Sequence, residues 1–167
     1  MNIAFPSPVS NFIISVWFHP DLRFQTVPPT SNSNFFLTDN HNLYYDIVSS
    51  TFKVGINTNN NSQYQTYALG DSVNYYGWNY LILANQPDGN GNTNITASLK
   101  NSFFSLNTFS TNVTGLINCS KICFCHNDII TNCCGFNNIK WMDLWYKDLK
   151  IWDGSKVNVW SIIQNYN

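Results

Sequence analysis

The sequence contains no glutamate, so all nine of its acidic residues are aspartate. Charged residues are scarce as well, at 10% of 167 residues, against about 25% in an average soluble domain. Asn, Ser and Thr supply the polarity instead. Cytosolic enzymes normally depend on Lys and Glu for solubility, so this composition favours an extracellular surface on which attached sugar replaces charge. The net charge of −1 gives no reason to expect nucleic acid or an anionic membrane as a partner.

Long hydrophobic runs are also lacking. No run approaches the roughly 18–20 residues that cross a bilayer, so we expect no membrane span in this segment. The first residues have neither the basic region nor the apolar region of a signal peptide, which favours a domain cut from a longer protein. Helix formers are few, and β-branched and aromatic residues are many, which favours an all-β chain. Its length fits one domain over residues 1–167.

The apolar pattern predicts a series of short strands. Residues 12–18 predict a strand with apolar side chains on both of its faces. Residues 77–99 predict a long β-hairpin, with a buried first strand, a glycine-rich tip and a half-exposed second strand. Residues 1–9 are expected to be a leading segment that ends in a turn. We expect further strands over residues 35–37, 42–48, 51–56, 64–68, 102–106, 113–117 and 139–153, and a short helix within 156–166.

Three stretches together resemble the concanavalin A-like, laminin-G-like jelly-roll family. Residues 14–18, ISVWF, are similar to its early strand that ends in aromatic residues, and Gly77-Trp78 and Asp88-Gly89 flank a similar middle strand. Residues 146–152, YKDLKIW, are similar to its closing strand, which returns beside the early one. The resemblance covers about residues 10–165 and implies a two-sheet antiparallel β-sandwich. The family includes lectins, adhesion modules and hydrolases, so its fold does not choose among them.

Catalytic residues are not expected. The hydrolases of this superfamily usually carry two glutamates and an aspartate on one strand, but this chain has no Glu and no D-x-D motif. The three histidines, His19, His41 and His126, are scattered and lack a nucleophile signature near them. We therefore expect no enzymatic activity.

Calcium is the one cofactor that the resemblance implies. Family members often bind Ca²⁺ at the rim of the sandwich through Asp and Asn side chains, which makes Asp88 and Asn90, beside Asn92, weak candidates. The alternative, which we favour, is that these residues simply form a hairpin tip that requires positive φ angles. Asp148 lies inside the apolar closing strand, where a charge must be paired, so we expect its carboxylate to accept backbone N–H groups.

The cysteines are concentrated in a predicted loop over residues 119–134. Their spacing lacks the paired C-x2-C hooks of common zinc sites, so local disulfides are favoured. We expect one bridge between the 119–125 group and the 133–134 pair, with the odd thiol buried, reactive or bonded to another chain. The candidates are Cys119, Cys123, Cys125, Cys133 and Cys134. Four N-x-[ST] sequons mark candidate glycosylation sites at Asn60, Asn94, Asn112 and Asn118.

Tryptophan and tyrosine are the remaining candidates for a site. An exposed face could stack on sugar rings through Trp78, Trp141, Trp145, Trp152, Tyr75 and Tyr76. The alternative, which we favour, is packing in the core or between chains. Strand alternation places Trp141 and Trp145 on one side of the closing strand and Trp152 on the other, so the first two are candidates for contacts with a ligand or another chain.

These observations predict a non-catalytic adhesion or structural-assembly module of a larger secreted or cell-surface glycoprotein. Its partners would be other chains or domains of the same extracellular assembly. The alternative is a lectin-like domain that binds glycans through an aromatic face or a rim calcium. The Asn-rich, Glu-free composition also suggests an AT-rich genome, such as that of a protist.

Overall fold

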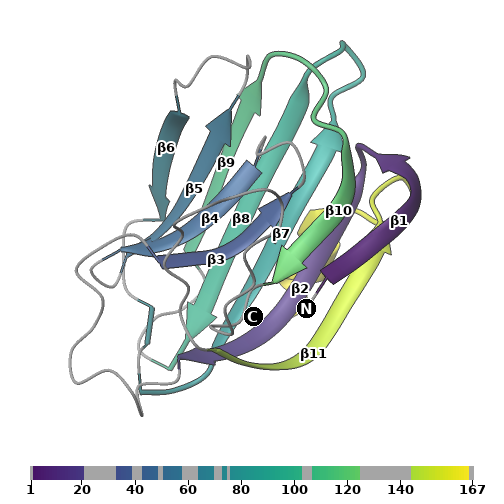
Figure 1. Cartoon of the computed structure of the whole chain (residues 1–167). Helices are drawn as coiled ribbons and strands as arrows, with labels where there is room; N and C mark the ends of the chain where they lie inside the picture. The colour runs from purple at the N-terminus through teal and green to yellow at the C-terminus, as the bar shows by residue number, and fades with distance from the viewer. Residues whose placement is uncertain are drawn as a thin grey trace.

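The computed structural model describes residues 2–20, 33–38, 43–48, 51–57, 64–69, 73–74, 76–102, 107–124 and 144–165. These residues form eleven strands and one short helix. The strands make two antiparallel sheets that face each other as layers of a sandwich (Figure 1). The all-β, two-sheet architecture expected from the sequence is therefore confirmed.

We name the two layers sheet A and sheet B. Sheet A has the order β1 (Asn2–Val9), β10 (Cys119–Phe124), β3 (Ser33–Thr38), β4 (Leu43–Val48), β5 (Thr51–Asn57) and β6 (Tyr64–Leu69). Sheet B has the order β11 (Leu144–Asp153), β2 (Phe12–Pro20), β7 (Asn79–Pro87), β8 (Thr93–Asn101) and β9 (Asn107–Val113). The closing strand β11 pairs with the early strand β2, as the resemblance implies.

Strand β2 is buried on both faces, as its alternating pattern predicts. Phe12, Ile14, Val16 and Phe18 point into the main core between the sheets. Ile13 lies on the opposite, outer face of sheet B, in a second apolar cluster with Ile82 and Ala84 of β7.

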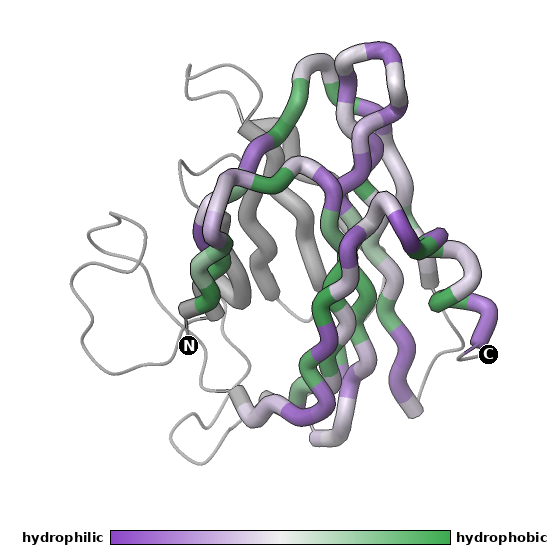
Figure 2. The backbone as a smooth tube through the Cα atoms, turned by 90° about the vertical axis from the view of Figure 1, so that its right-hand side faces the viewer, coloured by the Kyte–Doolittle hydropathy of each residue, from purple (hydrophilic) through white to green (hydrophobic). Residues whose placement is uncertain are grey.

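The helix α1 (Val159–Gln164) covers part of that outer face. Its buried residues Val159, Ile162 and Ile163 belong to the second cluster. The expected short helix is thus confirmed, and Asn158 caps it by accepting the backbone N–H of Trp160 at 2.9 Å. Figure 2 shows the C-terminal segment on the side of the molecule opposite the N-terminus.

The predicted hairpin is β7 and β8, but its second strand is more buried than expected. Thr96 and Ser98, which were expected to face solvent, are buried. The reason is that β9 pairs with β8 on its other side. Hydroxyl pairs satisfy the two side chains there: Thr96 with Ser110 at 3.2 Å, and Ser98 with Thr108. Burial then leaves neither of these two hydroxyl groups without a partner.

The strand expected over 113–117 is wrong, since β9 ends at Val113 and β10 begins only at Cys119. Gly115 turns the chain with a φ of 91°. Thr93 holds the turn, because its hydroxyl donates to the carbonyl oxygen of Gly115 at 2.8 Å and accepts the N–H of Ile117 at 3.1 Å. Of the strand expected over 102–106, only Ser102 is described, and it lies in a bend.

Two further expectations need correction. The leading segment is an edge strand, β1, in which Pro6 and Pro8 are tolerated because an edge strand pairs on one side only. The cysteine-rich segment does not begin as a loop, since Cys119–Phe124 forms β10 between β1 and β3.

Candidate functional site

A β-bulge in β11 shapes the outer face of sheet B. Lys147 pairs with Trp17 and Lys150 with Ser15, so two residues of β11, Asp148 and Leu149, stand opposite one residue of β2. Asp148 has a φ of 51°, in the left-handed region that aspartate tolerates better than most side chains. Its side chain is exposed. The expectation that the Asp148 carboxylate must be paired by backbone N–H groups therefore loses its basis, because the side chain faces solvent.

The bulge also decides which tryptophans share a face. Trp145 pairs with His19, and Trp152 pairs with Ile13. Since His19 and Ile13 alternate with the core residues of β2, both tryptophans lie on the outer face. The expectation that Trp145 and Trp152 point to opposite sides is wrong, because the extra residue at Asp148 inverts the alternation between them.

The two tryptophans differ in their surroundings. Trp152 is half-buried and packs against the second apolar cluster beside α1. Trp145 lies at the other end of β11, and 53% of its surface is exposed. We call the group of side chains near Trp145 the aromatic platform; it comprises Trp17, His19, Trp78, Trp145 and Lys147.

Ring contacts connect four members of the aromatic platform, and Trp145 lies beside them because it pairs with His19. The His19 ring meets Trp78 edge-on, with 5.5 Å between ring centroids. The Lys147 ammonium lies 4.4 Å from the ring centroid of Trp78 and 5.5 Å from that of Trp17. Trp17 in turn packs on buried Tyr80, at 4.9 Å between centroids. Trp78 keeps 37% of its surface exposed, so the platform presents indole rings and one ammonium group to solvent.

One described row of this face carries positively charged side chains. Along one row of sheet B the register runs from Lys147 through Trp17 and Tyr80 to Lys100. That row carries two lysines and no carboxylate, and Asp148 follows only in the bulge. The arrangement suits a ligand that combines an apolar face with a negative group.

A buried amide cluster holds the turn before Trp78. The side chain of Asn79 donates to the carbonyl oxygens of Asn74 at 2.9 Å and Gly77 at 3.1 Å. Its amide oxygen accepts the N–H of Asn74 at 2.7 Å and the side-chain amide of Asn101 at 3.1 Å. A Cβ at Gly77 would lie 2.5 Å from the side-chain nitrogen of Asn74. Sequence reasoning missed this support; the signal was an asparagine at the start of an otherwise apolar strand.

Asp88, the calcium candidate, acts as a cap of the hairpin tip. Its oxygens accept the backbone N–H groups of Asn90 at 2.7 Å and Asn92 at 3.0 Å, and the side-chain amides of Asn92 at 3.1 Å and Asn112 at 3.2 Å. These bonds, led by that of Asn90, lower the pKa of Asp88 to about 2. Calcium bound here would have to displace these donors, so the tip is better suited to a turn; the calcium site stays a prediction.

The other predicted sites are only partly described. Cys119 is buried in β10, and its thiol donates to the carbonyl oxygen of Lys121 at 3.2 Å. Asn94, Asn112 and Asn118 are exposed, and the first two are joined by a bond of 2.7 Å from the Asn112 amide to Asn94 Oδ1. The remaining predicted residues, or their side chains, lie outside the described residues: Asn60, Tyr75, Cys123, Cys125, Cys133, Cys134 and Trp141, with His41 and His126.

Two negative findings concern the described residues alone. No group of three or more His, Cys, Asp or Glu side chains gathers among them as a set of metal ligands. No helix among them has the length and apolar character to cross a membrane.

Comparison with known proteins identifies solved structures with a similar architecture. No family model matches the chain, and no curated protein sequence matches it. Solved structures do match, among them the binding domain of botulinum neurotoxin serotype D/C VPI 5993, with a TM-score of 0.55, 17% identity and coverage of 94% of this chain and 36% of that one. A second is the binding domain of botulinum neurotoxin DC in complex with SialylT, at TM-score 0.53, 14% identity and coverage of 94% and 35%.

A third match is titled "Cell entry of botulinum neurotoxin type C is dependent upon interaction with two ganglioside molecules", at TM-score 0.54, 16% identity and coverage of 94% and 35%. The likeness is one of fold. The chain spans about a third of the length of the structures it matches. The matches agree with a jelly-roll-like sandwich, while the narrower concanavalin A-like, laminin-G-like assignment rests on the sequence motifs alone.

Proposed function

We propose that this chain is a non-catalytic binding module of a secreted or cell-surface glycoprotein and that it binds carbohydrate through the aromatic platform. One observation carries the proposal: the exposed rings of Trp78 and Trp145 lie on the same sheet face, next to the ammonium of Lys147. Indole rings offer a flat apolar surface on which the C–H face of a sugar can stack. The ammonium adds a hydrogen-bond donor at that surface.

The positive charges of Lys147 and Lys100 indicate which class of sugar would bind. The Lys147 ammonium lies 4.4 Å from the ring centroid of Trp78, and Lys100 follows in the same register row. An anionic group on the ligand would gain a charge-assisted bond there. The preferred ligand is therefore a glycan that carries a carboxylate or a sulfate.

The titles of the similar structures support the ligand class. They name SialylT in complex with the binding domain of botulinum neurotoxin DC, and two ganglioside molecules on which cell entry of botulinum neurotoxin type C depends. Because this chain matches about a third of those structures, the likeness supports a glycan-binding role without locating a site. The location rests on the aromatic platform of this chain.

A second candidate function uses the same surface. Exposed tryptophans are also typical anchors of protein interfaces. Trp145 belongs to β11, which is an edge strand of sheet B, so a partner that packs on Trp145 can also reach the edge of the sheet. In that case the module would adhere to another chain or domain of the same extracellular assembly.

A glycan array that includes neutral, carboxylated and sulfated sugars tests the first candidate. We expect Trp145→Ala to weaken binding of every recognised sugar by about tenfold or more, which corresponds to about 1.4 kcal/mol. Lys147→Gln should weaken only the anionic sugars. Trp160→Ala is the matched control, since Trp160 lies on α1 with 46% of its surface exposed and outside the platform.

The other outcomes are equally informative. Binding that disappears with EDTA would move the site to a calcium ion at the sandwich rim and contradict the platform. If the unmodified chain binds no sugar but self-associates, and Trp145→Ala abolishes the association, the interface candidate replaces the carbohydrate one. Binding that survives Trp145→Ala would refute both uses of the platform.

A further inference from the structure

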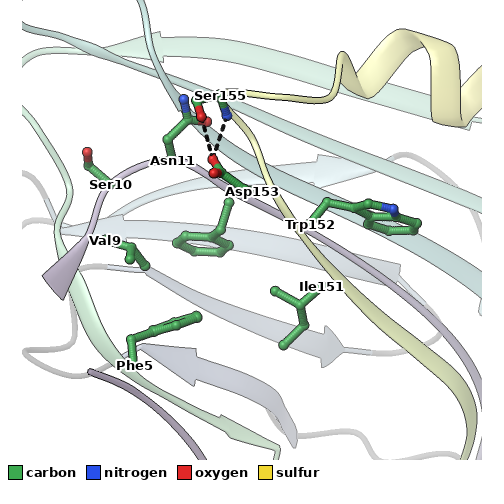
Figure 3. A pocket seen from close by; sticks show the side chains of 9 residues that line it. Phe5, Val9, Ser10, Asn11, Ile151, Trp152, Asp153 and Ser155 are labelled. Atoms are coloured by element: carbon green, nitrogen blue, oxygen red, sulfur yellow. Dashed lines mark hydrogen bonds between the residues drawn. The ribbon is translucent and has the colours of Figure 1, made fainter. Parts of the chain in front are cut away.

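A pocket on the open side of the sandwich is separate from the aromatic platform. It lies between β1 and the end of β11, which are edge strands of sheets A and B respectively. Its volume is about 460 Å³, within the range of small-molecule sites. Figure 3 shows the side chains that line it, which come from β1, the turn into β2, β2 itself, the end of β11 and the turn after it.

The inner part of this pocket is apolar. Phe5 and Val9 come from β1, Phe12 from β2 and Ile151 from β11. The rings of Phe5 and Phe12 are 6.2 Å apart between centroids and tilted by 33°. Phe5, Val9 and Ile151 pack against the main core but remain partly exposed. The pocket therefore offers two aromatic rings and aliphatic walls to the body of a ligand.

The mouth of the pocket carries acceptors and one negative charge. Asp153 accepts the hydroxyl of Ser155 at 2.6 Å and its backbone N–H at 2.9 Å. These bonds, led by the hydroxyl, lower the pKa of Asp153, so the carboxylate is ionised at neutral pH. Ser10, Asn11 and Ser155 are neutral, and the lining includes no lysine, arginine or histidine.

A second acceptor lies beside the mouth. The side-chain oxygen of Asn11 is buried and has no hydrogen-bond donor among the described residues. It packs against Gly154, where an added Cβ would collide with it. Because Asp153 is negative and the lining holds no cation, the pocket disfavours anions such as carboxylates and phosphates as ligands.

We propose that this pocket binds an organic ammonium ion, that is, a protonated or quaternary amine on an apolar or aromatic body. The body would occupy the apolar part between Phe5, Phe12 and Ile151. The ammonium group would lie at the mouth against Asp153, within reach of the aromatic ring faces, which attract cations. A neutral ligand would leave the charge of Asp153 unused.

Lys156 supplies an internal test of this arrangement. Its ammonium lies 3.6 Å from Asp153 Oδ2, and both side chains are largely exposed. The ammonium groups of Lys156 and of the ligand therefore compete for the carboxylate of Asp153. Removing Lys156 and removing Asp153 should change the affinity in opposite directions.

The experiment uses three probes with the same phenyl body and different charge: 2-phenylethylammonium, 2-phenylethanol and 3-phenylpropionate. Binding is followed by ¹H–¹⁵N chemical-shift titration of the whole chain. We expect 2-phenylethylammonium to bind with about millimolar affinity, as suits a fragment of this size, and to shift the amides of Asn11, Gly154 and Ser155. The neutral and anionic probes should bind at least about tenfold more weakly.

Substitutions in the pocket and in the aromatic platform then test where the probe binds and what binds it. Asp153→Asn should weaken 2-phenylethylammonium by about tenfold, whereas Lys156→Gln should strengthen it about twofold to fivefold. Both positions are exposed and an Asn side chain at 153 still offers an oxygen to Ser155, so the variants should keep the far-UV CD spectrum of the parent chain. Trp145→Ala should leave the affinity unchanged.

Three results would overturn the proposal. One is equal binding of 2-phenylethanol, which would make the pocket a neutral apolar site. Another is an unchanged affinity in Asp153→Asn. The third is a set of shifts that centres on the aromatic platform instead of the pocket.

Discussion

The bulge at Asp148 makes a prediction that can be worked out in detail. Asp148 has a φ of 51° and an exposed side chain, so its backbone conformation rather than a buried contact decides which residues fit there. An L-residue in the left-handed region costs roughly 1–2 kcal/mol, and Asn and Asp tolerate it best. Asp148→Asn is the reference variant, since it removes the charge while keeping the shape and the φ tolerance.

The expected magnitudes follow from that cost. Asp148→Gly relieves the strain but adds about 0.5–1 kcal/mol of chain entropy, so its stability should lie within about 0.5 kcal/mol of the Asn variant or above it. Asp148→Ala should be less stable than the Asn variant by about 1 kcal/mol, and Asp148→Val by about 2 kcal/mol, because a β-branched side chain fits this region worst. For a chain of this size, each 1 kcal/mol corresponds to about 2–4 °C in Tm.

Urea unfolding at neutral pH measures the order of the four variants. A deletion of Asp148 tests the second consequence, because it restores regular alternation along β11. Tyr146 and Ile151 pack on the main core from either side of the bulge, so the deletion should force one half of the strand to turn over. The NMR signals of the Lys147 side chain report on this, since we expect the ring of Trp78, 4.4 Å from the ammonium, to shift them upfield in the parent chain.

Two results would refute the reasoning. If Asp148→Val were as stable as Asp148→Asn, the left-handed conformation would be wrong. If the upfield shift of Lys147 and the packing of Trp152 on the second apolar cluster both survived the deletion, the bulge would not determine which face the two halves of β11 occupy.

Three further predictions concern other parts of the chain. Leu81→Ala should lower the free energy of unfolding in urea by about 2–5 kcal/mol, because Leu81 is fully buried. The control Leu116→Ala changes an exposed residue and should alter this free energy by no more than about 0.5 kcal/mol. Equal effects of the two variants would contradict the assigned core. Asp88 should titrate at a pKa of about 2 by NMR instead of the ordinary 3.8. Because its pKa is lowered on folding, its contribution to stability is complete above pH 3.8 and is lost as the pH falls through about 2. Asp88→Asn should therefore remove that part of the pH dependence of stability. Cys119 should react with an alkylating reagent only after unfolding, because its thiol is buried and bonded to a carbonyl oxygen; mass spectrometry that finds rapid labelling of the native chain would contradict this.

Much of the fold follows from local patterns. Side chains of a strand alternate between its faces, so residues 12–18 showed which side chains would fill each cluster before any partner strand was known. The tip after β7 was equally readable, since Gly89 and Gly91 adopt φ angles of 84° and 86° and an adjacent Asp is a common cap of such turns. Strands β3 to β6 and the short helix were predicted within a few residues for the same local reason.

The cysteine-rich segment and β8 were misread because their environment is set by distant strands. Residues 119–124 look like a loop by composition, yet they pair with β1 and β3. Thr96 and Ser98 look like an exposed strand face, yet β9 lies beside them and supplies Ser110 and Thr108 as hydrogen-bond partners. Composition shows that a hydroxyl needs a partner but not whether water or protein provides it.

The aromatic platform shows most clearly which features the sequence determines and which depend on the tertiary structure. The sequence by itself determined that the closing strand is apolar and rich in tryptophan, and its resemblance to the jelly-roll family implied that it pairs with the early strand. Only the tertiary structure decided that Trp145 shares a face with Trp152 and that Lys147 lies over Trp78. A single extra residue inverts the alternation of a strand, and its position is set by the register with β2, a strand far away in the chain.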